Sequence, residues 1–258
     1  MVFEKLLKKI VFRSHATSES LISHLRKQGV EIGDNTCFFY PHNVHIDATR
    51  PYMLKIGSNV QITRDVSILT HGYDWSVLKG AYGDVLGSCG KVEIGNNVFI
   101  GFGATILKGV TIGDNVIIGA GSLVTHDIPA NTVAAGCPCK PIMTLSQYYE
   151  KRQAAQLDEA YEQYACWRSA HEGTPLPIVF REFFWLFAEM DEDGHFDVPE
   201  FERIMHFVPS SYKLSIRRWR DSKHLFSTYD EFSSLLLKTL FCSKLKFHTY
   251  SMKGEKYD

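Results

Sequence analysis

The sequence predicts a mainly β protein in which short strands are wound into a repeating coil, with helices before and after it. Three observations support this prediction. Aliphatic residues recur every six positions in the middle of the chain, turn-forming residues follow them at fixed places, and both ends lack the repeat. A period of six matches neither the turn of an α-helix nor the simple alternation of a half-buried strand.

The repeat is clearest between residues 94 and 124. Aliphatic residues open successive hexads at Ile94, Ile100, Ile106, Ile112, Ile118 and Val124. The same phase extends toward the N-terminus, with one break at Arg50, through Ile32, Phe38, Val44, Ile56, Ile62 and Ile68. We expect one aliphatic side chain per hexad to point inward, so that stacked rungs form a continuous core.

Turn-forming residues mark the corners of the coil. They are Gly33-Asp34-Asn35, Gly57-Ser58-Asn59, Gly95-Asn96-Asn97 and Gly113-Asp114-Asn115. Both Gly and Asn tolerate the positive φ angles that such corners need. The 26 positions that separate Ile68 from Ile94 are not a multiple of six, which predicts an insertion at about 69–92.

The chain is therefore expected to have three parts. These are an N-terminal helical segment at 1–29, the coil domain at 30–145 and an α-helical extension at 146–258. In the first part, residues 14–28 are expected to form a helix that ends at Gly29.

The extension is expected to contain helices at about 145–170, 176–190, 198–206 and 229–241. Capping-box patterns that begin at Thr144, Asp197 and Thr228 predict three of the helix starts. Five aromatic residues in 176–190 are expected to form a small helical core, with a sugar-stacking platform as the alternative.

Composition limits the function classes. The net charge of the 258-residue chain is -1, which argues against a nucleic-acid-binding protein. Six scattered cysteines do not suggest a disulfide framework, so a reducing, cytoplasmic compartment is expected. No apolar run has the length of a membrane span. The basic, amphipathic segment Met1–Arg13 and the C-terminal helices leave peripheral contact with the inner face of a membrane open, alongside packing on the protein body.

The segment Ile94–Ile142, IGNNVFIGFGATILKGVTIGDNVIIGAGSLVTHDIPANTVAAGCPCKPI, resembles the hexapeptide-repeat acyltransferases. It is most similar to the galactoside and maltose acetyltransferases and to O-acetyltransferases of bacterial surface polysaccharides. The resemblance covers about residues 30–145. It implies a left-handed parallel β-helix, a homotrimer with active sites between subunits, acetyl-CoA as co-substrate and no metal. The implied activity is O-acetylation of a sugar hydroxyl in surface polysaccharide or glycan biosynthesis.

Acetyl transfer to a hydroxyl group needs a base, because a neutral alcohol is a poor nucleophile. Histidine suits this role because its pKa lies near neutral pH. His71 lies where the regular coil ends and the insertion begins, and the family has its catalytic histidine at this place. A backbone carbonyl or a carboxylate is expected to fix its tautomer, and Asp74 is a candidate for orienting it or for binding the acceptor.

Three further residues are candidates for acceptor binding. Asn43 matches, in repeat phase, an acceptor-binding asparagine of galactoside acetyltransferases, and Asp47 lies near it in sequence. Trp75 lies in the Gly-rich insertion, where it either stacks on a sugar or anchors the loop. The alternative for Asn43 and Asp47 is a structural role at a corner of the coil.

The resemblance also implies a set of coenzyme-binding positions. They are Phe99, Phe102, Ala120, Thr125, His126 and Lys140. Phe99 takes the place of a Trp that lies against the pantetheine arm. His126 takes the place of a Lys, which makes a phosphate contact there weaker or pH-dependent. Lys140 takes the place of an Arg and is expected near the phosphates, with a solvated surface charge as the alternative.

Three other functions are alternatives to sugar O-acetylation. The same machinery acting on the amine of an amino sugar or a xenobiotic is barely distinguishable from sequence. A zinc site of the γ-carbonic anhydrase kind needs a His-x4-His pair, which the sequence lacks. A non-catalytic trimeric scaffold would release no coenzyme A with any acceptor.

Overall fold

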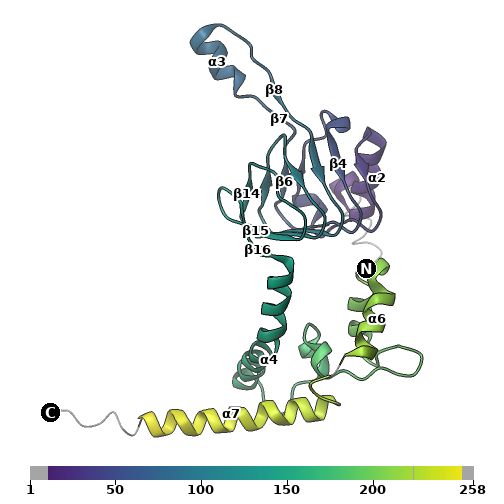
Figure 1. Cartoon of the computed structure of the whole chain (residues 1–258), viewed down its shortest axis with the longest axis vertical. Helices are drawn as coiled ribbons and strands as arrows, with labels where there is room; N and C mark the ends of the chain where they lie inside the picture. Colours follow the sequence, from purple (N-terminus) through teal and green to yellow (C-terminus); the bar gives the residue numbers. More distant parts are fainter. Residues whose placement is uncertain (1–10, 223, 252–258) are drawn as a thin grey trace, which may run out of the picture. The chain divides into compact units, whose positions relative to one another are not determined.

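A computed structural model describes residues 11–222 and 224–251 (Figure 1). The chain forms two compact units, Met1–Glu150 and Lys151–Asp258, and each has its own hydrophobic core. Most of the basic segment Met1–Arg13 lies outside the described residues. None of the described helices is long and apolar enough to cross a lipid bilayer.

Short strands of the first unit alternate in a fixed cycle among three sheets. The first cycle is β1 (Glu31–Ile32), β2 (Cys37–Phe38) and β3 (His45–Ile46). Later cycles follow the same order: β4 (Leu54–Ile56), β5 (Gln61–Ile62), β6 (Ser67–Ile68), β9 (Val92–Ile94), β10 (Val98–Ile100), β11 (Thr105–Ile106), β12 (Thr111–Ile112), β13 (Val116–Ile118) and β14 (Leu123–Val124). Strands of successive cycles pair in parallel, so the coil is a parallel β-helix, as predicted.

The inward residues of the hexads stack directly on one another. In the sheet of β1, Ile32 pairs with Ile56, Ile56 with Ile94, and Ile94 with Ile112. Most rungs bury two side chains, because alternate residues along a strand point to the same side. Val98 and Ile100 are each 0% exposed, and Phe99 between them faces outward. The expectation of one buried aliphatic per hexad was therefore too low.

The first turn of the coil departs from the predicted phase. Ile46, not Val44, pairs with Ile68, because the 3-10 turn η2 (Pro41–Asn43) adds residues before β3. A second turn, η3 (Pro51–Met53), adds more before β4. The residues that the two turns add sum to a multiple of six, so the aliphatic residues keep the same phase before and after them. The sequence therefore shows a single break, at Arg50, where the structure has two insertions.

Asparagine and glycine have different roles at the corners. Asn35, Asn59, Asn97, Asn115 and Asn131 have φ angles of 55° to 57°. The glycines before them do not have positive φ, which corrects that expectation. They are required by space: a Cβ on Gly95 would lie 2.5 Å from Asp114 Oδ1 and 2.8 Å from the carbonyl carbon of Gly113 in the next turn.

The predicted insertion forms an arm that projects from the coil (Figure 1). It consists of β7 (His71–Gly72), α3 (Trp75–Tyr82) and β8 (Ser88–Cys89), and β7 and β8 pair antiparallel. α3 buries none of its residues within this chain. The coil then continues to β15 (Thr132–Ala135), which pairs antiparallel with β16 (Lys140–Thr144).

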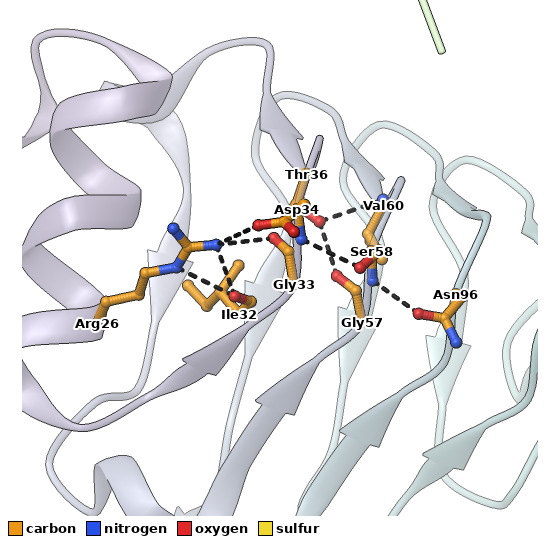
Figure 2. Close-up of polar contacts among 9 residues, drawn as sticks. All are labelled: Arg26, Ile32, Gly33, Asp34, Thr36, Gly57, Ser58, Val60 and Asn96. Atoms are coloured by element: carbon orange, nitrogen blue, oxygen red, sulfur yellow. Dashed lines mark hydrogen bonds and ion pairs between the residues drawn. The ribbon is translucent and has the colours of Figure 1, made fainter. Parts of the chain in front are cut away.

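A helix covers the N-terminal end of the coil. α2 (Ser18–Gln28) packs Leu21 and Leu25 into the core and ends at Gly29, whose φ is 104°. The predicted helix over 14–28 begins later than expected, because η1 (Arg13–His15) is a separate 3-10 turn. Arg26 donates hydrogen bonds to the carbonyls of Ile32 and Gly33, at 2.7 Å and 3.0 Å from Nη2, and so satisfies the open edge of the first rung (Figure 2).

The second unit is helical, as predicted, and is built around aromatic side chains. Its elements are α4 (Leu145–Ala170, which starts in the first unit), η4 (Pro177–Phe180), η5 (Phe184–Leu186), α5 (Pro199–Met205), η6 (Pro209–Ser211), α6 (Tyr212–Asp221) and α7 (Tyr229–Ser251). Phe180, Phe187 and Phe232 are buried in one cluster, and Phe184 packs on Phe201 and Trp219. This burial supports a core, not a sugar platform, for the aromatics of 176–190.

Two local predictions in this unit are wrong. Residues 176–190 form two short 3-10 turns, because the aromatics must reach the core from several directions, which one helix face does not allow. Asp197 does not cap α5, whose N-cap is Val198. The capping box at Thr144 is confirmed by reciprocal hydrogen bonds with Gln147, and Thr228 Oγ1 accepts a hydrogen bond from the Glu231 N–H.

Because the stacked rungs share one core, Ile100→Ala should lower the free energy of unfolding of the first unit by about 2–5 kcal/mol. Ile100 is 0% exposed, whereas Ile142 on β16 is 56% exposed. Urea unfolding followed by circular dichroism measures the change. Ile142→Ala is the control and should change the midpoint little; equal midpoints for the two variants would contradict the described core.

Candidate active site

The arm leaves the coil at the end of β6, and His71 is its first residue. The backbone there is fixed on both sides, because the Leu69 N–H donates to the Ile106 carbonyl and the Gly90 N–H donates to the Thr70 carbonyl. His71 therefore has a defined position even though the arm projects from the coil. Its side chain is 13% exposed.

A buried carboxylate orients the His71 imidazole. Asp47 Oδ2 lies 2.5 Å from His71 Nδ1, and the Asp47 side chain is only 4% exposed. Asp47 follows β3 directly, in the turn of the coil next to His71. A bond this short is typical of a charge-assisted hydrogen bond. It assigns the proton to Nδ1, which leaves Nε2 as the nitrogen that accepts a proton.

Two threonines complete the surroundings of Asp47. Thr70 donates to Oδ2 from its backbone N–H at 2.9 Å and from Oγ1 at 2.6 Å. Thr49 donates to Oδ1 from Oγ1 at 2.7 Å. Burial by itself raises the pKa of the Asp47 carboxyl, but the hydrogen bonds from Thr70, Thr49 and His71 lower it by more. Its pKa consequently lies well below the ordinary range, so the carboxylate is ionised at neutral pH.

An open pocket of about 510 Å³ adjoins this pair of residues. It is lined by side chains of the first turn, including His45 and Thr49, and by His71 and Tyr73 of the arm. The Tyr73 ring lies edge-on to the imidazole, with 4.9 Å between ring centroids. A volume of this size suits a small-molecule ligand. An ionised aspartate, the histidine that it orients and an adjoining pocket together can remove a proton from a bound hydroxyl group.

The predicted acceptor residues Asn43, Asp74 and Trp75 do not line this pocket. Asn43 is in η2, where its carbonyl accepts a hydrogen bond from the Asp65 N–H. Trp75 begins α3, and its ring centroid is 6.3 Å from that of Tyr73. Asp74 is exposed at the N-cap of α3 and does not cap it with its side chain. The carboxylate bonded to His71 is Asp47, so the expectation that Asp74 orients the histidine is wrong.

The predicted coenzyme residues fall into two groups on the later turns of the coil. The first group is Thr125 and His126, which follow β14, two rungs beyond Leu69 and Thr70 in the same sheet; their side chains are 2.8 Å apart. The second group belongs to the sheet that contains β10, β13 and β16. In it, Phe99 lies on the outer face of β10, Phe102 and Ala120 follow β10 and β13 at equivalent positions one turn apart, and Lys140 begins β16. Phe99 and Phe102 are 39% and 54% exposed, which leaves them accessible to a ligand that runs along the coil.

His71 stays the predicted base, and the sequence did not indicate the residues that bond to its ring and orient it. Asp47 was a candidate only for acceptor binding or for a corner of the coil, and Thr49 and Thr70 were not candidates. Their proximity to His71 depends on the pairing of Ile46 with Ile68, which η2 and η3 conceal in the sequence. The one sequence feature that could have indicated Asp47 is its position directly after the strand β3. Among the described residues, no group of three or more His, Cys, Asp or Glu side chains is arranged to hold a metal ion.

Comparisons with known proteins agree on the central segment. The family model described as bacterial transferase hexapeptide (six repeats) matches residues 91–126. Protein CapG of Staphylococcus aureus is 42% identical over 127 residues, which are 49% of this chain and 73% of CapG. Galactoside O-acetyltransferase of Escherichia coli (strain K12) is 40% identical over 126 residues, 47% of this chain and 59% of that protein. A solved structure of a maltose O-acetyltransferase from Clostridium difficile 630 is 32% identical, covers 54% of this chain and 81% of the other, and has a TM-score of 0.36.

Because the pKa of the Asp47 carboxyl is lowered in the folded protein, we expect its contribution to the free energy of unfolding to depend on pH. Asp47→Asn should lower the free energy of unfolding at pH 7 by about 1–3 kcal/mol, because the amide leaves a buried donor unpaired. A depressed folded-state pKa stabilises the protein above the unfolded pKa of about 4 and loses this effect as pH falls toward the folded value. The difference between variant and wild type should therefore shrink below about pH 4. Urea titrations at pH 7 and pH 3 test this, with Asp84→Asn on the exposed arm as control; a constant difference would contradict it.

Proposed function

Because this chain belongs to the hexapeptide-repeat acyltransferase family, we propose that it transfers an acetyl group from acetyl-CoA to a hydroxyl group of a sugar. The hydrogen bond of 2.5 Å between buried Asp47 and His71, beside an open pocket, is the observation that carries the proposal. The similarity to a protein named galactoside O-acetyltransferase supports the acetyl group and the sugar acceptor. Surface polysaccharide or glycan biosynthesis is the proposed setting.

In the proposed reaction, His71 Nε2 removes the proton from the acceptor hydroxyl as its oxygen attacks the acetyl carbonyl. Asp47 stabilises the imidazolium that forms and keeps Nδ1 protonated throughout. When the tetrahedral intermediate collapses, the C–S bond breaks and the new ester forms. His71 then returns the proton to the departing thiolate, so the base is regenerated and no covalent enzyme intermediate is needed.

The donor is proposed to run along the later turns of the coil. Phe99 and Phe102 would contact the pantetheine arm, and the backbone near Ala120 and Thr125 would bind its amides. His126 and Lys140 are the side chains proposed to contact the phosphates. Resemblance to the family further supports a left-handed coil, a homotrimer with sites between subunits, and a cytoplasmic location. Asn43, Asp74 and Trp75 are proposed to contact the acceptor.

Replacement of the base tests the proposal directly. His71→Ala should lower kcat by about 10²–10⁴-fold with the KM for acetyl-CoA little changed, because general-base catalysis contributes that much. Asp47→Asn should give a smaller decrease in kcat. Thiol release from acetyl-CoA is measured with a panel of sugars as acceptors, and His24→Ala, at an exposed position on α2, is the control. Full activity of His71→Ala would rule the mechanism out.

The donor site is tested separately. Lys140→Gln should raise the KM for acetyl-CoA several-fold with kcat unchanged, because the contact with the phosphates is lost equally in the ground state and in the transition state. The effect should weaken at high ionic strength, where wild-type binding is also screened. Lys91→Gln, which removes an exposed lysine elsewhere on the coil, is the control. An unchanged KM would remove Lys140 from the coenzyme site.

A further inference from the structure

Tyr73 combines two properties that few aromatic residues of the first unit share. It lies beside the proposed base, with its ring at 79° to the imidazole and 4.9 Å between centroids. It is also 69% exposed, although it is a large aromatic residue. A structural aromatic would bury its ring, whereas a ring held next to a reactive group and left open to solvent is available to a ligand.

The position of Tyr73 is fixed by its neighbours. It is separated from His71 by a single residue, Gly72, in extended backbone, so both side chains emerge on the same side of the arm. A Cβ on Gly72 would lie 2.5 Å from Asp74 Oδ1, which keeps this turn of the chain tight. The half-buried Trp75 ring lies 6.3 Å from Tyr73 on the side of α3. Tyr73 is therefore a placed residue and not the tip of a loose loop.

The remaining walls of the pocket complement an aromatic contact. Thr49 and His45 supply polar groups, Leu69 and Tyr73 supply apolar surface, and His71 also lines the pocket. A pyranose presents apolar C–H groups on one face and hydroxyl groups around its edge. Such a ligand places its face on an aromatic side chain while one edge hydroxyl meets the base. A small acceptor without a ring would gain nothing from Tyr73.

We infer that Tyr73 is a specificity-determining residue of the acceptor site, which stacks against the ring of a pyranose and directs one of its hydroxyl groups to His71 Nε2. This inference rests on the proposed function and names the ring of the acceptor as the feature recognised. It assigns to Tyr73 the stacking role that the sequence offered for Trp75.

The test compares Tyr73→Ala, Tyr73→Phe and a matched control. Tyr82 lies on the same arm, is 78% exposed and does not line the pocket, so Tyr82→Ala is the control. The probes are acetyl-CoA with nitrophenyl pyranosides of galactose, glucose and N-acetylglucosamine. For whichever pyranoside the wild type acetylates, Tyr73→Ala should raise the acceptor KM about tenfold, equivalent to about 1.4 kcal/mol. The KM for acetyl-CoA should not change, and Tyr73→Phe and Tyr82→Ala should resemble the wild type.

Three outcomes would overturn the inference. An unchanged acceptor KM in Tyr73→Ala would show that the ring is not part of the acceptor site. A parallel rise in both KM values would show a general disturbance of the arm, and an equal effect of Tyr82→Ala would show the same. These results are distinct from failure of the proposed function, which would appear as full activity of His71→Ala or no turnover by the wild type.

Discussion

Backbone hydrogen bonds between successive turns of the coil set the position of every other feature of the first unit. They bring residues far apart in sequence to the spacing of neighbouring strands, about 4.8 Å, and repeat this at each rung. The columns of buried Ile and Val follow from this register. So does the need for glycine at corners such as Gly95, where the next turn leaves no room for a Cβ. The same stacking places Asp47 beside Thr70 and His71 across a gap of more than twenty residues.

The Asp47–His71 pair shows how burial and hydrogen bonding compete at the proposed site. Removing a carboxylate from water favours its neutral form, yet donors from Thr70, Thr49 and His71 keep it charged. Because the Asp47 carboxylate is buried, its negative charge interacts with the His71 imidazole and is little screened by solvent. The coil supplies the rigid half of the site and the arm supplies His71 and Tyr73, so a proton acceptor and an aromatic surface meet at one pocket.

The second unit is stabilised differently. It has no repeating register, and a cluster of rings formed by residues such as Phe184, Phe187 and Trp219 holds its short helices together. The capping box at Thr144 begins α4 and could be predicted from the sequence, because capping depends on a few adjacent residues. The two 3-10 turns in 176–190 could not be predicted, because their form depends on which aromatic rings fill the core.

Periodicity and neighbouring residues, which a single chain displays directly, predicted the coil, the insertion and the helical ends. Resemblance to the family added the parallel strands and made His71 the candidate base. Only the tertiary structure decided that Ile46 and not Val44 continues the rung, and therefore that Asp47 and not Asp74 bonds to the imidazole. The physical reason is that a strand's register depends on the length of backbone taken up by the turns before it. The turns η2 and η3 together add a multiple of six residues. The six-residue period in the sequence is therefore unchanged, although the side chains that lie next to one another are different.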